Sequence, residues 1–231
     1  MVLYQPPADF DGTPNRYVLR RGSCLWRVHN HPAYDAWAFK SKRAEVLYGG
    51  ARFDATEADP YPFLYAGLTE ETALAETLLR DIPPDDRGYR TVLNPAVSQR
   101  RIAALVLIGD LQLVSLIDAK DLAAIGQDSW LVTAPGAEYG QTRDWAHWLR
   151  RQAGWAHGLV WDSLRDRGSL ALVLFGDRLA RDFGTDYEKA LLREIPELAV
   201  FLGDEAGATW ASERLRRDRA VVQPPPPAPP C

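Results

Sequence analysis

The sequence predicts an α+β fold, and three observations support this prediction. Short apolar runs have the length and composition of buried strands, among them residues 102–108 and 170–175. Residues 141–152 carry Trp145, Trp148 and Leu149 at helical spacing. Strands and helices follow one another without the regular alternation that is typical of a parallel α/β sheet. We therefore expect a mixed arrangement of both kinds of element.

Two strands are expected in the N-terminal half. Residues 25–29 form a short strand-like run with Arg27 inside it. Residues 63–66 are apolar, with aromatic rings at alternate positions, and Gly67 ends the run.

A helix follows the second of these strands. Thr69 has the place of an N-cap, and carboxylates follow it in the first turn, where they favour the helix dipole. The helix is expected to extend to Arg80, with Glu76 on the face opposite Leu74 and Leu78. The proline pair at residues 83–84 prevents it from continuing.

The C-terminal half has further strands. Residues 102–108 and 111–116 flank a Gly-Asp pair, which predicts a hairpin. Residues 158–161 predict a strand that leads to Ser163, and residues 170–175 predict another.

Composition excludes several classes of protein. The chain has 231 residues and a net charge of -4, so we expect no direct binding to nucleic acid. Two cysteines, Cys24 and Cys231, and four histidines give neither a disulfide framework nor metal-ligand spacing, so no metal is expected. Without a signal peptide or a membrane-spanning run, a cytoplasmic location is expected.

Nucleotide-binding and hydrolase motifs are absent: no P-loop, dinucleotide-binding glycine pattern or nucleophile elbow occurs. Instead, polar residues lie at strand ends and turns. They are Arg27, Arg52, Tyr65, Glu76 and Ser163. Taken one by one, each is better explained as an ordinary structural or solvated residue.

In combination, these residues lie in four motifs in a fixed order. The motifs are LWRVH (25–29), GARF (50–53), LYAGLTEETALAETLL (64–79) and GLVWDSLRDRGSLALVLFGDR (158–178). This order resembles the RES-domain family, which is named for its arginine, glutamate and serine. The third and fourth motifs are the most specific.

The resemblance implies a fold and an activity. RES proteins resemble ADP-ribosyltransferases, with a split mixed β-sheet and helices packed around an NAD cleft. Family members degrade NAD by hydrolysis or phosphorolysis, and many are the toxin of a toxin–antitoxin pair. The implied partners are therefore NAD as substrate, inorganic phosphate as an alternative acceptor, and a protein antitoxin; a homo-oligomer is also compatible with the sequence.

The resemblance also assigns roles to residues. Glu76, Arg52 and Ser163 are expected to be catalytic: the carboxylate stabilises an oxocarbenium-like state, the arginine pairs with the pyrophosphate and the serine orients the nicotinamide ribose. Arg27, Tyr65 and Tyr48 are expected to bind NAD together with Arg52 and Ser163. Either Arg27 or Arg52 could hold the phosphates, and the Tyr65 ring could stack on the cationic nicotinamide.

Four segments are expected along the chain. They are a lead-in segment (1–23), a RES-like catalytic domain (24–182), a helical extension (183–220) and a disordered proline-rich tail (221–231).

Two other functions fit the same residues. The first is an ADP-ribosyltransferase that modifies a macromolecule, and the second is a binding module without catalytic activity.

Overall fold

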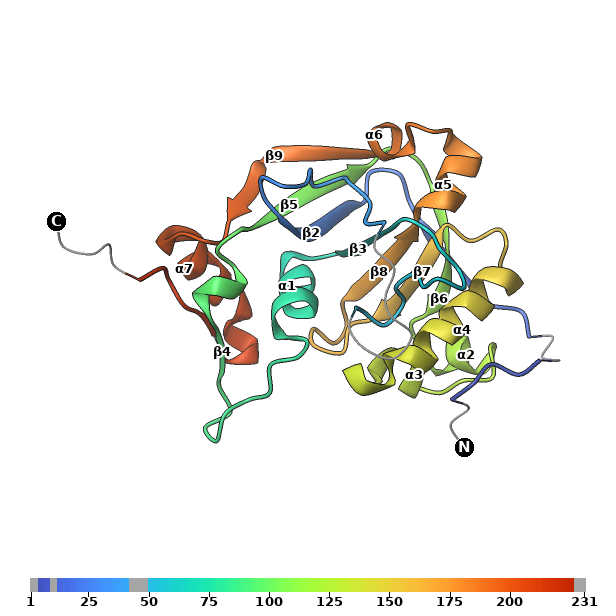
Figure 1. Cartoon of the computed structure of the whole chain (residues 1–231), viewed down its shortest axis with the longest axis horizontal. Helices are drawn as coiled ribbons and strands as arrows, with labels where there is room; N and C mark the ends of the chain where they lie inside the picture. Colours follow the sequence, from blue (N-terminus) through green and yellow to red (C-terminus); the bar gives the residue numbers. More distant parts are fainter. Residues whose placement is uncertain (1–3, 9–11, 42–49, 227–231) are drawn as a thin grey trace.

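The computed structural model describes residues 4–8, 12–41 and 50–226. It confirms the α+β class: a large mixed sheet is accompanied by helices on both sides (Figure 1). Tyr48, expected to bind NAD, and Gly49 lie outside the described residues, as do residues 227–231 of the proline-rich tail.

The main sheet has eight strands in the order β1-β6-β7-β8-β3-β2-β5-β9. The strands are β1 (Arg16–Leu19), β2 (Cys24–Asn30), β3 (Phe63–Gly67), β5 (Arg100–Leu107), β6 (Leu111–Leu116), β7 (Gly158–Asp162), β8 (Leu170–Phe175) and β9 (Leu192–Phe201). Strands β6 and β7 pair in parallel, and the other neighbours are antiparallel. Most of these strands are apolar runs of the kind that the sequence predicted.

The sheet is split between β2 and β3. One pair of residues, Trp26 and Gly67, joins these two strands, whereas β2 and β5 share seven pairs and β3 and β8 share five. The ladder β2-β5-β9 therefore diverges from the ladder β1-β6-β7-β8-β3, as Figure 1 shows. The split mixed sheet expected from the sequence is confirmed.

The helices are mostly short. They are α1 (Glu70–Leu74), α2 (Ala119–Ala123), α3 (Trp130–Thr133), α4 (Tyr139–Gln152), α5 (Gly176–Phe183), α6 (Tyr187–Leu191) and α7 (Glu205–Arg214). A π-helical segment, η1 (Ala75–Leu79), continues α1 directly. Three 3₁₀ turns complete the set: η2 (Asn94–Ala96), η3 (Gly136–Glu138) and η4 (Leu215–Asp218). The Thr69 hydroxyl caps α1 by accepting a hydrogen bond from the Thr72 N–H, as predicted.

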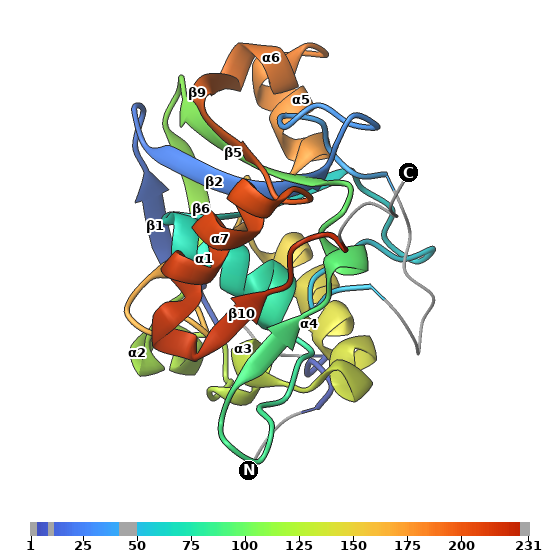
Figure 2. The same cartoon turned by 90° about the vertical axis from the view of Figure 1, so that its left-hand side faces the viewer.

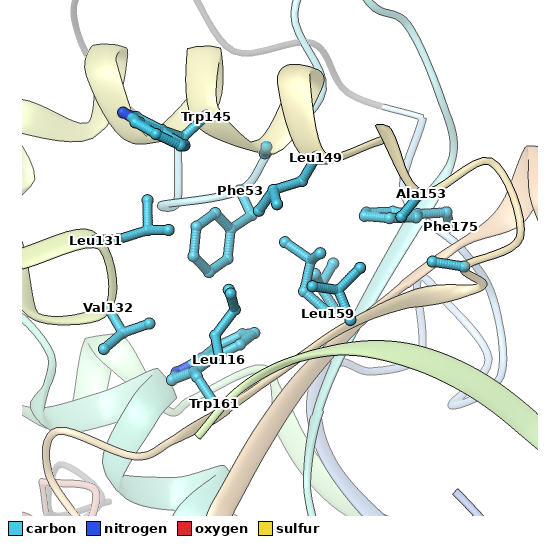
Figure 3. Packing of buried hydrophobic residues seen from close by; sticks show 14 of the residues in the cluster. Phe53, Leu116, Leu131, Val132, Trp145, Leu149, Ala153, Leu159, Trp161 and Phe175 are labelled. Carbon is cyan, nitrogen blue, oxygen red and sulfur yellow. The ribbon is translucent and has the colours of Figure 1, made fainter. Parts of the chain in front are cut away.

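Helix α4 packs on one face of the sheet and forms the largest apolar cluster (Figure 3). Phe53 is fully buried between Trp145 and Leu149 of the helix and Trp161 of β7. Because Phe53 is anchored in this core, the neighbouring turn that carries Arg52 is fixed to it.

The predicted hairpin between residues 102–108 and 111–116 is wrong. Both segments are strands, but β5 pairs with β2 and β9, while β6 pairs with β1 and β7. The Gly-Asp pair therefore marks a crossing from one ladder to the other. The pairing of strands distant in sequence overrides the local turn signal.

The C-terminal segment is only in part the helical extension that we expected, since strands accompany its helices α6 and α7. Residues 192–201 form β9 at the edge of the main sheet, and β10 (Ala220–Val222) pairs in parallel with β4 (Arg90–Val92). Helix α7 lies against α1 (Figure 2). The lead-in segment likewise supplies β1. Residues 16–19 and 192–222, which lie outside the expected catalytic domain, are therefore parts of the fold.

Candidate functional site

A cleft of about 340 Å³ opens where the sheet is split. Its walls come from β2, β3, the turn at residues 50–54 and the helix that carries Glu76. Four of the predicted residues line it: Arg27, Arg52, Tyr65 and Glu76. Residues that are up to 49 positions apart in the sequence are thus brought to one site by the divergence of the two ladders.

Glu76 lies in the π-helical segment, which is an uncommon conformation that is frequent at functional sites. Its side chain is half-buried, and the preceding Ala75 is fully buried. The Ser163 hydroxyl donates a hydrogen bond of 2.6 Å to Glu76 Oε1. This bond fixes the carboxylate at the cleft wall.

Ser163 is fully buried and is not part of the cleft wall. Its oxygen accepts hydrogen bonds from the N–H groups of Arg165 at 3.2 Å and Asp166 at 3.0 Å. With both acceptor sites occupied, its one proton is directed to Glu76. Ser163 therefore holds Glu76, and the direct contact with the ligand that we expected for Ser163 does not fit this position.

Arg27 is buried on β2. Its Nη1 donates to the carbonyls of Ala36 and Ala38, each at 2.6 Å. Burial lowers the pKa of Arg27 to about 10, although the charge of Glu188 acts in the opposite direction. The guanidinium thus organises the segment that follows β2 and keeps a positive charge at the cleft.

Arg52 is also buried, in a turn that is attached to α4. Its carbonyl accepts a hydrogen bond of 2.7 Å from the Thr142 hydroxyl. Its guanidinium lies over the ring of Tyr139, 5.4 Å from the centroid, and donates to the Ala134 carbonyl at 3.5 Å. Arg52 Nε has no hydrogen-bond partner among the residues that the structure describes, so donor capacity remains for a ligand.

Tyr65 lies on β3 with its ring packed edge-on against Phe63 and Trp161. Its hydroxyl accepts a hydrogen bond of 3.0 Å from the Phe53 N–H. Burial, and after it the charge of Asp54, raises the pKa of Tyr65 well above its usual value. Tyr65 is therefore a neutral phenol that joins the cleft wall to the turn bearing Arg52.

Sequence reasoning missed other charged residues of the cleft. Lys40, Arg80 and Arg100 add cations, while Asp54 joins Glu76 as an acid, which makes five cations against two carboxylates in the described wall. Within the described ranges, no carboxylate lies at ion-pair distance from Lys40 or Arg100. Burial lowers the pKa of Arg100, and the charge of Arg80 adds to this effect. The cleft is thus electropositive and suited to an anionic ligand.

The described residues contain neither a cluster of metal ligands nor a membrane-spanning helix. No group of three or more His, Cys, Asp or Glu side chains able to hold a metal ion occurs among them. None of their helices combines the length and apolarity needed to cross a membrane.

The family model of the RES domain matches residues 24–191. This chain belongs to the RES-domain family. The matched region contains all four sequence motifs and every described residue of the cleft wall.

The RES domain also has a structural neighbour. One chain of the crystal structure of the M. tuberculosis MbcT–MbcA toxin–antitoxin complex superposes with a TM-score of 0.54 and 13% identity. The match covers 87% of this chain and 91% of that chain, so the likeness extends beyond the family match, and at this identity it shows the fold. No curated protein matches the sequence.

Proposed function

We propose that this RES-domain protein cleaves NAD at the nicotinamide–ribose bond and acts as the toxin of a toxin–antitoxin pair. One observation carries the proposal: a carboxylate fixed by a buried serine faces a cleft in which cations outnumber acids. An NAD molecule carries two phosphate charges and a cationic nicotinamide ring, so its binding requires both kinds of group.

The cations would hold the pyrophosphate. Arg52 has an unused Nε and a planar guanidinium that can form paired hydrogen bonds to phosphate oxygens. Arg27 and Arg100 lie on the neighbouring strands β2 and β5 and add positive charge on the other wall.

Glu76 would act on the ribose. Departure of nicotinamide leaves an oxocarbenium-like sugar, and a fixed carboxylate stabilises its positive charge. The hydrogen bond from Ser163 prevents the carboxylate from rotating. Water or inorganic phosphate would then attack the sugar, which completes a hydrolysis or a phosphorolysis.

A protein antitoxin is proposed as the partner, because the structural neighbour was solved in a toxin–antitoxin complex. The net charge of -4 favours an antitoxin with a basic docking segment.

The test is release of nicotinamide from NAD by the purified protein, with and without inorganic phosphate. We expect turnover in the wild type and a loss of about 100-fold or more in Glu76→Gln, which keeps the side-chain volume and removes the charge. Glu197→Gln, an exposed carboxylate on β9, is the matched control and should retain full activity.

Three other results would change the proposal. Intact NAD under both conditions, with antitoxin shown to be absent, would contradict it. Transfer of label from NAD to a macromolecule would favour an ADP-ribosyltransferase. Equal toxicity of Glu76→Gln and wild type in cells would favour a binding module without catalytic activity.

A further inference from the structure

Several hydrogen bonds fasten the helix that carries Glu76 to the loop at residues 163–166, among them one of 2.8 Å from the Arg165 guanidinium to the Arg80 carbonyl at the end of the helix. Two of them determine the position of Glu76. The first link is the hydrogen bond from Ser163 to Glu76. The second lies one helical turn earlier, where Thr72 Oγ1 donates to Asp166 Oδ2 at 2.7 Å. Residues 72 and 76 are four positions apart, so the two links lie along the same side of the helix.

Asp166 takes part in both links. Its backbone N–H donates to Ser163 Oγ, and its carboxylate binds Thr72. The same carboxylate oxygen accepts a weaker hydrogen bond of 3.3 Å from the N-cap residue Thr69. Asp166 is 9% exposed and Thr72 is fully buried, so this polar contact is shielded from water.

Neither Asp166 nor Thr72 lines the cleft. Both are therefore unable to act on a ligand directly. Their contacts determine instead where the helix lies relative to Ser163. A buried hydrogen bond to a charged group is strong enough to select one such position.

We propose that Asp166 and Thr72 are positioning residues that hold Glu76 in its reactive orientation. For catalysis, this inference rests on the proposed cleavage of NAD. Without the hydrogen bond from Thr72, the first turn of the helix is held to the loop by the weaker contact of Thr69 with Asp166, and Glu76 shifts relative to the ribose.

The test compares Thr72→Val with wild type. Valine keeps the shape of threonine and lacks the hydroxyl. We expect kcat for nicotinamide release to fall about 10- to 100-fold with KM little changed, because a small misplacement of a catalytic group affects the transition state more than binding. Thr72→Ser restores the hydroxyl and should recover most of the lost kcat.

Ser115→Ala is the matched control, since the hydroxyl of Ser115 on β6 also binds an aspartate, Asp121 of α2, and neither residue lines the cleft. It should leave kcat unchanged. Asp166→Asn, which keeps the volume and one oxygen acceptor, is the second variant if Thr72→Val fails to fold.

A crystal structure of Thr72→Val gives a readout that does not depend on turnover. We expect the distance of 2.6 Å between Ser163 Oγ and Glu76 Oε1 to lengthen beyond hydrogen-bond range. If wild type does not cleave NAD, the proposed function fails, and this distance alone then tests whether Thr72 and Asp166 position Glu76. An unchanged distance, or an unchanged kcat in an active protein, would overturn the inference.

Discussion

At the scale of single residues, Arg52 is the cation most fully built into the site. Its backbone is bound by α4, its side chain lies over Tyr139 and its Nε is unused. Lysine has neither a planar face for the ring nor a second donor in a fixed direction.

Arg52→Lys is therefore expected to weaken NAD binding about 10-fold or more, which corresponds to the loss of one hydrogen bond to a charged group. Isothermal titration in the Glu76→Gln background would measure this without turnover. Arg20→Lys is the control, because Arg20 is an exposed arginine that follows β1, pairs with Asp110 and does not line the cleft. Equal affinities of wild type and Arg52→Lys would exclude Arg52 from phosphate binding.

His29 gives a prediction on pH. It is buried, its Nδ1–H donates to the Tyr34 carbonyl at 3.0 Å, and its Nε2 has no partner in the part of the chain that the structure describes. Burial, and then the charge of Arg27, lowers the pKa of His29. As the pH falls, His29 is therefore protonated in the unfolded chain before it is protonated in the folded chain. The folded state loses stability as the pH drops below the unfolded pKa of about 6.5.

We expect the midpoint temperature of thermal unfolding to decrease when the pH is lowered from about 7.5 to about 5.5. The decrease should be smaller in His29→Asn, because asparagine keeps a donor for the Tyr34 carbonyl and does not titrate. His31→Asn, at a half-exposed position, is the control. An identical fall in wild type and His29→Asn would show that another group is responsible.

At the scale of elements, the helix bearing Glu76 is enclosed by the C-terminal segment. Leu74, Leu78 and Leu79 pack in one cluster with Ala211 and Leu215. An ion pair between Glu70 and Arg214 connects α1 and α7 at the surface. Residues beyond the family match therefore pack against the outer side of the helix that carries Glu76.

Leu215→Ala is expected to lower the free energy of unfolding by about 2–5 kcal/mol, since Leu215 is fully buried and its removal leaves a cavity beside the helix. Urea unfolding would measure it. Val221→Ala, exposed on β10 in the same segment, should have a far smaller effect. Equal losses in the two variants would contradict the assigned packing.

Local elements could be predicted where local chemistry decides them. The strand at residues 63–67, the cap at Thr69 and the helix α4 depend on apolar spacing and on one hydroxyl, all readable in the sequence. The hairpin was wrong, and the helical extension missed β9, because the partners of β6 and β9 lie far away in the chain. The family resemblance predicted the split sheet, which no local pattern indicates.

At the scale of the whole molecule, the residues of the cleft also divide into those that the sequence motifs identify and those that only long-range strand pairing brings there. Four residues of its wall could be predicted, because they belong to the family motifs. Arg100 was missed, since it reaches the cleft wall only when β5 pairs with β2 and places it opposite Asn30. Lys40 was missed for a similar reason: it reaches the wall through its bridge to Phe63.

The near-absence of hydrogen bonds between β2 and β3 has a consequence for how such a protein can diversify. In a continuous sheet, a change in one strand disturbs the pairing of the next. Here the two ladders are paired almost entirely within themselves, so Arg100 can be exchanged on one side of the cleft without disturbing the pairing that holds Tyr65 on the other. The strand pairing of the two ladders can accordingly evolve separately. Ligand preference could be redesigned by changing Arg100 on one ladder while the ladder that carries Tyr65 is kept unchanged.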